Sequence, residues 1–362
     1  MLAPLDWGLG HATRCIPIIN GLLQQGHQVI IGAEGAQAAL LQQEFPALTI
    51  ITLKGYRIKY SRNKWLLPLK IIAQIPQILR AIHHEHQWLK TIVANEQIDL
   101  VISDNRYGLY HTKIPAIFIT HQLQIKAPFG WLENILRKIN YQYINRFTAC
   151  WVPDMATSPG IAGKLSHPTK MPAVPVLYIN LLSRFKIQPQ PIKYNICILL
   201  SGPEPQRTML ENILLKEMHH VTVPVLLIRG KPMDNTLPKV PLHVTVANHL
   251  NAQLLEDAIQ QSEWIICRSG YTTVMELLSL KKNMLVIPTP LQTEQEYLGQ
   301  QLMQSNLAIS FKQNNFNLQD ALEEAKTFEY QQNKAIIFQE KNLTALLQQS
   351  LFKSGETKYE QI

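Results

Sequence analysis

The sequence has 362 residues, of which 46% are hydrophobic and 17% are charged, and its formal net charge is +8. This length predicts two domains, and this composition excludes a disordered chain. No apolar run approaches the roughly 20 residues of a membrane span, the first residues lack a signal pattern, and the four cysteines lack CxxC spacing. We therefore expect a cytoplasmic protein with reduced thiols.

Basic charge is concentrated in the first half of the chain. Residues 1–186 hold 19 basic and 9 acidic residues, whereas residues 187–362 hold 15 and 17. Within 54–90, eight lysines and arginines accompany a single acid, Glu85, and alternate with apolar residues. Such a stretch is typical either of contact with an anionic membrane, at on the order of 1 kcal/mol per basic residue, or of a solvated helix face. Because no nucleic-acid-binding motif accompanies it, we expect no nucleic-acid partner.

Short β-branched runs alternate with helical patterns along the chain, which predicts βαβ units and parallel sheets. The first series of predicted strands is 28–33, 48–53, 99–103, 115–120 and 149–154. The second is 194–201, 224–230, 243–247, 263–269 and 283–288, with helices at 204–218, 251–261 and 271–280. A Pro- and Gln-rich stretch at 186–195 separates the two series. We predict an α/β protein with domains at 1–186 and 194–350, a linker at 187–193 and a disordered tail at 351–362.

The stretch DWGLGHATR, residues 6–14, follows a short first strand at 1–5. That brevity suggests a natural start further upstream or a clipped sheet edge. Gly8 and Gly10 allow the backbone to approach a phosphate or sugar oxygen, and His11 at the helix start has a pKa suited to accepting a proton. The alternative is a strand-to-helix turn with a capping histidine. Thr13 stands where a dinucleotide-binding GxGxxG motif needs glycine, so a nicotinamide enzyme is disfavoured.

A second motif, CRSGYTTVMEL at 267–277, also lies between a predicted strand and a helix. Ser269 and Gly270 form the turn, and the backbone N–H groups of the following residues, including Thr272 and Thr273, point toward any phosphate placed there. Glu276 is suited to accept hydrogen bonds from a ribose diol. The alternative is a capped helix with an ordinary surface glutamate.

Further strand ends carry polar residues of the kind that bind ligands. The loop SGPEPQR offers Ser201, Gly202 and Arg207 to a diphosphate, and the loop PTPLQTEQEY offers Gln292, Glu294 and Gln295 to hydroxyl groups. Asp104 and His121 end two strands of the first domain; they are candidates for the acceptor side and are equally suited to cap or turn positions. His83, His84 and His86 lack metal-ligand geometry and no DxD motif occurs, so we expect no metal ion and no cofactor.

The pattern CRSG..TV.E resembles the nucleotide-binding motif of the MurG-type glycosyltransferases, and GLGHATR with Q.EQ is similar to uncharacterised bacterial and archaeal MurG-related transferases. The resemblance covers most of the chain. It implies the GT-B fold, in which two Rossmann-like domains face across a cleft, a family 28-type C-terminal domain binds the nucleotide sugar and the N-terminal domain binds the acceptor. It further implies Glu276 at the ribose, Ser269 and Gly270 at the diphosphate, and His249 and Leu250 at the base. SGPEPQR departs from the family pattern, because two prolines stand where MurG has small polar residues.

These features predict an inverting hexosyltransferase that moves a sugar from a UDP-N-acetylhexosamine or UDP-hexose to a hydroxyl acceptor. A polyprenyl-phosphate or glycolipid acceptor in cell-envelope glycan synthesis, reached at the inner face of the cytoplasmic membrane, would explain the basic first half. His11 is the predicted base, with Asp104 or His121 in reserve, and Arg207 or Arg268 neutralises the leaving diphosphate. The alternatives are a MurG-like nucleotide-sugar hydrolase, a non-catalytic nucleotide-sugar or glycan-binding protein and, more distantly, an epimerase.

Overall fold

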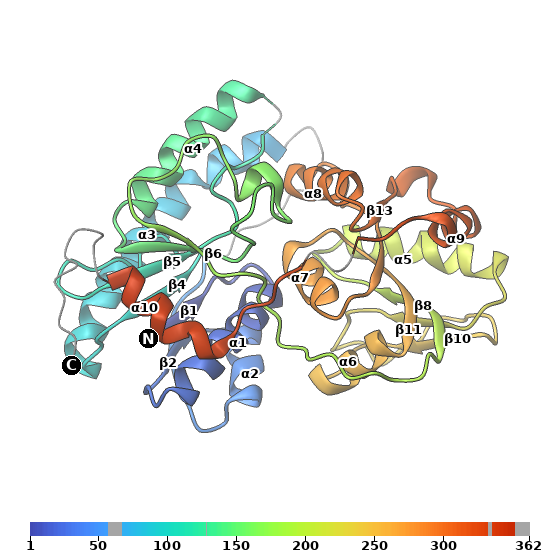
Figure 1. Ribbon diagram of the computed structural model, residues 1–362, viewed down its shortest axis with the longest axis horizontal. Helices are drawn as coiled ribbons and strands as arrows, with labels where there is room; N and C mark the ends of the chain where they lie inside the picture. The colour runs from blue at the N-terminus through green and yellow to red at the C-terminus, as the bar shows by residue number, and fades with distance from the viewer. Residues whose placement is uncertain (57–66, 128, 332–334, 352–362) are drawn as a thin grey trace. The chain divides into compact units, whose positions relative to one another are not determined.

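The computed structural model describes residues 1–56, 67–127, 129–331 and 335–351, excluding the side chains of 67–75. The chain divides into two compact units, Met1–Arg184 with Ile337–Ile362, and Phe185–Ile336. Each unit is a parallel sheet flanked by helices (Figure 1). No helix in the described part of the chain is long and apolar enough to cross a membrane.

The first unit contains a seven-stranded parallel sheet in the order β3-β2-β1-β4-β5-β6-β7. Its strands are β1 (Leu2–Pro4), β2 (Ile30–Ala33), β3 (Thr49–Thr52), β4 (Val101–Asp104), β5 (Ala116–Ile119), β6 (Ala149–Val152) and β7 (Val176–Tyr178). Its first helices are α1 (Leu9–Gln24), α2 (Gly35–Glu44), α3 (Leu67–Glu96) and α4 (Gly130–Ile144). Since crossovers between parallel strands are right-handed, α1 and α2 cover one face and α3 and α4 the other (Figure 1).

The short first strand lies at the centre of its sheet. β1 pairs with β2 on one side and with β4 on the other. The idea of a clipped sheet edge is therefore wrong. Every residue of β1, β4, β5 and β6 is buried, as expected for strands covered on both faces.

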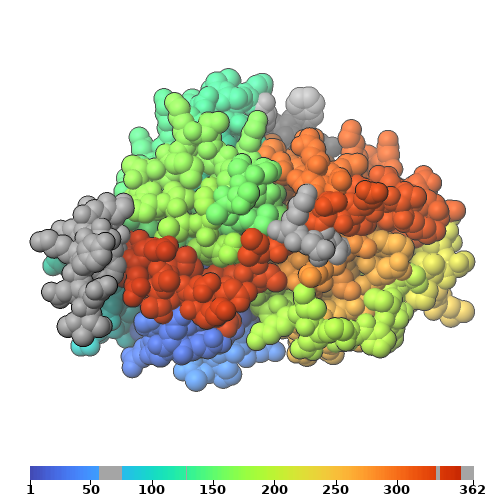
Figure 2. Space-filling view, in the orientation of Figure 1, coloured from blue at the N-terminus to red at the C-terminus, as the bar shows by residue number. Residues whose placement is uncertain are grey.

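The C-terminal segment returns to the first unit. Ile337 forms a bridge with Leu181, and α10 (Leu343–Leu351) follows a 3-10 turn, Glu340–Asn342, that packs on α1. The buried Trp151 on β6 donates a hydrogen bond from Nε1 to Ser350 Oγ at 2.8 Å. Figure 2 shows this segment in red beside the blue N-terminal helices. The predicted second domain, 194–350, therefore ends earlier, because α10 buries its apolar side on the first unit; residues 352–362 of the predicted tail lie outside the described residues.

The second unit contains a six-stranded parallel sheet in the order β10-β9-β8-β11-β12-β13. Its strands are β8 (Tyr194–Leu199), β9 (Val225–Ile228), β10 (Val244–Ala247), β11 (Ser262–Cys267), β12 (Asn283–Val286) and β13 (Ile309–Ser310). Its helices are α5 (Gln206–Glu217), α6 (Ala252–Gln260), α7 (Tyr271–Ser279), α8 (Thr293–Gln304) and α9 (Leu318–Thr327). Residues of α5 and α9 share one apolar core cluster with β8 and β9, so these two helices cover the same face.

Each sheet has one point at which the order of successive strands changes direction. β1 leads to β2 on one side while its other neighbour, β4, leads to β5 on the opposite side. β8 and β11 have the same relation in the second sheet. Ligands of open parallel sheets bind beyond the carboxyl ends of such strand pairs. The predicted motifs at 6–14 and 267–277, and the loop at 201–207, all follow these strands.

Candidate functional site

In the first unit, a histidine and a buried aspartate meet at the switch point. His11 lies in the first turn of α1, and its Nδ1 is 2.8 Å from Oδ2 of Asp104 at the end of β4. The Asp104 side chain is fully buried, whereas that of His11 is 15% exposed. A histidine and an aspartate that are 93 positions apart in the sequence are thus in direct contact.

Arg14 is a further candidate for this site that the motif analysis did not single out. Its Nε lies 2.9 and 3.0 Å from the two carboxylate oxygens of Asp104, and its Nη2 also contacts Oδ1. Its Nη1 lies 3.4 Å from Nδ1 of His121 at the end of β5. The signal was present in the sequence, because residues three positions apart on a helix share one face, as His11 and Arg14 do. The predicted residues His11, Asp104 and His121 are therefore brought together, with Arg14 between them.

This arrangement determines the protonation of the pair. Burial opposes ionisation of Asp104, but Arg14 and His11 outweigh it and hold the pKa of the carboxyl below its ordinary 3.8. Burial, with the charge of Arg14, lowers the pKa of His11 below 6.5, although Asp104 opposes the shift. At neutral pH the aspartate is therefore charged and the histidine neutral. Since a carboxylate only accepts, Nδ1–H donates to Asp104 and Nε2 keeps the lone pair.

The glycines of the three motif loops lie in open positions. Gly8 (φ +79°), Gly202 (φ +100°) and Gly270 would each have no described atom within 4 Å of an added Cβ. Positive φ explains the glycine at the first two positions. Gly10 lies inside α1 instead, where its carbonyl accepts a hydrogen bond from Thr13. Ser201 is exposed beside Gly202.

In the second unit, the turn between β11 and α7 is hydrogen-bonded to the first turn of α8. Ser269 is fully buried and donates from Oγ to the carbonyl of Gln295 at 2.8 Å. The Gln295 side chain in turn accepts from the backbone N–H of Thr289 at 2.9 Å. Gly270 is the N-cap of α7, and Glu276 lies further along this helix with 9% of its surface exposed. The side chains of Ser269 and Gln295 thus shape the turn, while the helix begins at an open glycine.

Arg268, which lies between β11 and this turn, is a buried cation. Only 2% of its surface is exposed, and its guanidinium donates to backbone carbonyls of Ile287, Pro288 and Gln206 at 2.8–3.2 Å. No ion pair is recorded for it within the described residues, and burial lowers its pKa to about 10. Among the described residues its charge is therefore balanced by carbonyl dipoles, and an uncompensated positive charge favours an anion nearby.

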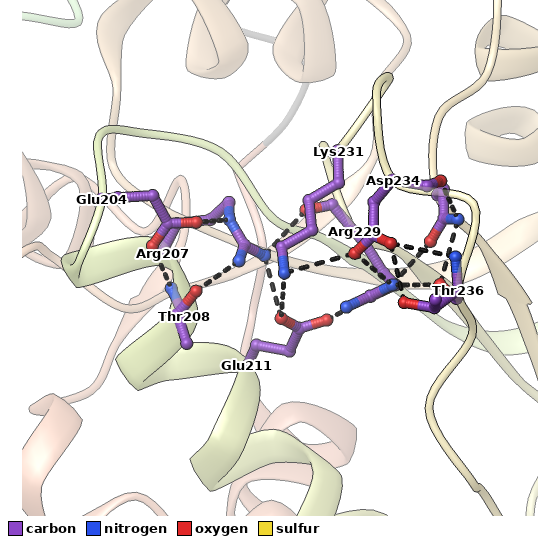
Figure 3. Close-up of polar contacts among 9 residues, drawn as sticks. Glu204, Arg207, Thr208, Glu211, Arg229, Lys231, Asp234 and Thr236 are labelled. Atoms are coloured by element: carbon purple, nitrogen blue, oxygen red, sulfur yellow. Dashed lines mark hydrogen bonds and ion pairs between the residues drawn. The ribbon is translucent and has the colours of Figure 1, made fainter.

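Arg207, a predicted diphosphate contact, lies in a buried network of ion pairs. It is 3% exposed and donates to Glu204, to Glu211 and to the carbonyl of Arg229 (Figure 3). Glu211 also accepts from Arg229, so two buried guanidinium groups share its carboxylate. These contacts favour a structural role for Arg207 over the predicted diphosphate contact.

The same network holds the segment ANHL. Arg229 Nη1 donates to Asn248 Oδ1 at 2.7 Å, and the Lys231 N–H donates to the carbonyl of Asn248 at 2.7 Å. Nearby, the carboxylate of Asp234 accepts hydrogen bonds from both the backbone N–H and the hydroxyl of Thr236 (Figure 3). His249 is exposed and Leu250 is half-buried directly after this anchor. The network therefore connects the predicted base-binding segment to helix α5.

The remaining predicted residues lie around these loops. Gln292 is the N-cap of α8, Glu294 lies in its first turn, and Thr272 and Thr273 lie half-buried in the first turn of α7. In the basic stretch 54–90, residues 57–66 lie outside the described residues. Glu85 is not on a surface: it is 1% exposed and accepts from Arg106 Nε at 2.7 Å and from the hydroxyl of Tyr56. Among the described residues no group of His, Cys, Asp and Glu is placed to hold a metal ion.

Removing Glu211 should destabilise the second unit. We expect Glu211→Ala to lower the free energy of unfolding by about 3–5 kcal/mol, because two buried arginines lose their shared carboxylate. Arg229 and Arg207 outweigh burial and hold the pKa of Glu211 below 4.5, so its contribution is present above pH 4.5 and is lost as the pH falls through the lowered value. Urea titration at pH 7 and pH 4 measures both effects. Glu323→Ala, in an exposed ion pair, is the control and should cost under about 1 kcal/mol; an equal loss in both variants contradicts the assignment.

Comparisons with known proteins of similar sequence or structure are consistent with the two-unit architecture. Residues 207–351 match the family model described as the glycosyltransferase family 28 C-terminal domain. A relative from Methanosarcina acetivorans, described as an uncharacterized glycosyltransferase, is 23% identical over 315 residues, which cover 80% of this chain and 79% of the relative. Among solved structures, spinosyn forosaminyltransferase SpnP has a TM-score of 0.64 at 11% identity, and Acinetobacter baumannii MurG has 0.56 at 16%. Each alignment covers 96% of this chain and 98% of the other.

Proposed function

We propose that this chain, a glycosyltransferase with the GT-B fold and a family 28-type C-terminal domain, transfers a sugar from a UDP-linked donor to a hydroxyl acceptor with inversion. The donor sugar is a hexose or an N-acetylhexosamine. The observation that carries the proposal is the open turn at Gly270, which begins α7 two positions after the carbonyl-bound cation of Arg268. A helix N-terminus and a buried cation together favour a diphosphate.

The proposed reaction uses the neutral His11 beside Asp104 in the first unit and the positive charge near Gly270 in the second unit. Neutral His11 takes the proton of the acceptor hydroxyl at Nε2, while Asp104 holds the ring and stabilises the imidazolium that forms. The acceptor oxygen bonds to the anomeric carbon as the bond from that carbon to the diphosphate breaks. A single displacement of this kind inverts the configuration. Arg268 and the backbone N–H groups at the start of α7 stabilise the charge on the leaving diphosphate, and Glu276 holds the ribose hydroxyls.

The nucleotide can be identified by a thermal-shift panel of UDP, GDP, TDP and CMP, each with and without its sugar. We expect a shift with UDP and its sugars and little with the others. A shift with another nucleotide would correct the base. No shift with any nucleotide would contradict the donor site.

Product analysis separates transfer from the two alternatives. A hydrolase that uses water in place of the acceptor releases free sugar and UDP without any acceptor present. A non-catalytic binding protein binds the nucleotide sugar without turnover. Under the proposed function, sugar release is slow until an acceptor is added, and each UDP formed is matched by one glycosylated product.

We expect the transfer to need no metal ion, because Arg268 and the start of α7 supply the positive charge that faces the diphosphate. Initial rates in excess EDTA should match those in added magnesium within about twofold, which is under 0.5 kcal/mol in barrier. A rate that is lost in EDTA and fully recovers when one specific divalent ion is added would contradict this expectation.

A lipid-linked acceptor is supported by an apolar stripe on α4. Trp131, Ile135 and Ile139 lie four positions apart and are 45–64% exposed, and Phe129 beside them stacks on Trp131 with ring centroids 6.3 Å apart. Arg137 and Lys138 lie on the same helix. Tryptophan beside basic residues is typical of a helix at a membrane interface. We propose that this face, together with the basic stretch 54–90, contacts the inner face of the cytoplasmic membrane.

Charged substitutions on this stripe test the membrane contact. Trp131→Glu with Ile135→Glu should lower partitioning onto anionic vesicles by at least about tenfold, since burial of each such side chain is worth roughly 1.5–3 kcal/mol. Sedimentation with phosphatidylglycerol vesicles measures it. Leu242→Glu, at a fully exposed leucine of the second unit, is the control. Unchanged partitioning of the double variant removes the membrane proposal.

A further inference from the structure

A small cavity in the first unit lies beside the residues proposed to act on the acceptor. It has a volume of about 170 Å³ and is lined by three aromatic residues, Trp7, Tyr56 and Tyr107, two amides, Asn105 and Gln122, and apolar side chains including Leu5. Cavities of roughly 150 Å³ hold one benzene molecule, so this one has room for a single six-membered ring.

The two tyrosines of the cavity are held rigidly by their hydroxyl groups. The Tyr56 hydroxyl donates to Glu85 at 2.8 Å and accepts from the N–H of Tyr107 at 3.1 Å. The Tyr107 hydroxyl donates to Asn140 at 2.8 Å, and its ring stacks on Phe118. Because both hydroxyls are bound elsewhere, the tyrosines contribute carbon surface to the cavity wall. Such walls pack well against the C–H face of a ring.

The two amides come from the strand ends that also carry the acid and the second histidine of the site. Asn105 follows Asp104 at the end of β4, and Gln122 follows His121 at the end of β5. Their backbones are fixed: the Asn105 N–H donates to the carbonyl of Ile119 at 3.0 Å, and the carbonyl of Gln122 accepts from Asn140 at 2.9 Å. Asn105 has φ +61°, a conformation that few residues with side chains adopt and that recurs at functional sites.

A cavity lined by both amide and aromatic residues favours binding of a ring that has both polar groups and apolar faces. An amide both donates and accepts, which matches the hydroxyl group of a sugar. A purely aromatic ring would leave the two amides without partners, which costs binding free energy. We propose that this cavity binds one pyranose ring of the acceptor, so that the acceptor is itself a saccharide or carries a terminal sugar. The inference rests on the proposed function.

The test uses simple ring compounds in place of the unknown acceptor. Saturation-transfer NMR with the full chain and methyl glucoside, methyl galactoside and methyl N-acetylglucosaminide should detect at least one glycoside at millimolar concentration. Phenol, the aromatic comparator, should bind more weakly. Asn105→Gly, which tolerates the positive φ, and Gln122→Ala should each weaken glycoside binding about three- to tenfold. Trp7→Ala should weaken it as well.

Controls separate this inference from the proposed function. Trp131→Ala, outside the cavity, should leave glycoside binding unchanged. Each cavity variant should keep the wild-type melting temperature and the thermal shift produced by UDP, because the donor site belongs to the second unit. Glycoside binding that is equal in all variants, or binding of phenol without any glycoside, overturns the inference while the proposed function stands. Loss of the UDP response in the wild type contradicts the proposed function instead.

Discussion

Replacing Glu276 with alanine is expected to abolish the thermal shift produced by UDP and to lower kcat/KM by about 10²–10⁴. The proposed role of this carboxylate is to accept two hydrogen bonds from the ribose, and hydrogen bonds to a charged group are each worth about 1.5–3 kcal/mol. Its position supports this: Glu276 lies on the helix that begins at the open Gly270 turn and is 9% exposed. Isothermal titration with UDP measures the loss directly.

One matched control keeps the shape of Glu276 without its charge, and the other removes a glutamate at a different position. Glu276→Gln keeps the size and one acceptor oxygen and should retain weak binding. Glu329→Ala removes an exposed glutamate of the same unit and should change nothing. A UDP response that survives Glu276→Ala in a folded protein would show that the ribose binds elsewhere.

Replacing His11 with alanine is expected to lower kcat by about 10²–10⁴ while UDP binding by the second unit stays unchanged. The proposed base must be neutral to accept a proton. Because burial and Arg14 lower its pKa, the acid limb of kcat/KM should have its midpoint below the ordinary histidine value of 6.5. Activity is therefore retained down to a lower pH than an unperturbed histidine allows, and is lost as the imidazole becomes protonated.

Asp104→Asn distinguishes the pair from a single histidine. Asp104 raises the pKa of His11, so removing its charge should move the acid limb to still lower pH, while kcat falls because the ring loses its orienting partner. Circular dichroism and the UDP thermal shift provide the folding control, since Arg14 also loses a partner. An acid limb that stays in place in Asp104→Asn, or full activity in His11→Ala, would move the base to another residue.

Most of the fold could be predicted because its signals are local. All eleven predicted strands, counting the short first strand at 1–5, overlap observed strands, and the three predicted helices of the second half coincide with α5, α6 and α7. The two missed strands, β7 and β13, have three and two residues, too few for a pattern to emerge. The return of α10 to the first unit was also missed, because its apolar side matches either sheet and nothing in its own sequence specifies the partner.

The candidate sites also contain some features that local sequence signals predict and others that depend on distant residues. Gly8 and Gly202 were found because a turn with positive φ between strand and helix favours glycine, and Gly270 because its motif lies at a strand-to-helix turn. The buried ion pairs of Arg207 and Glu85 were not predicted, since whether a charged side chain is buried depends on residues distant in the sequence. Arg207 meets Arg229 and Glu211 inside the fold, and Glu85 meets Arg106 and Tyr56.

The sequence by itself determined the two parallel-sheet domains, the turns at their strand ends and the residues available there, because periodicity and turn chemistry act over short distances. Only the tertiary structure decided which of those residues meet. His11 and Asp104 pair because β1 and β4 are neighbours in the sheet although β2 and β3 lie between them in the chain. Arg14 joins them because it lies one helical turn beyond His11. Strand order depends on the packing of the whole sheet, and no local pattern contains it.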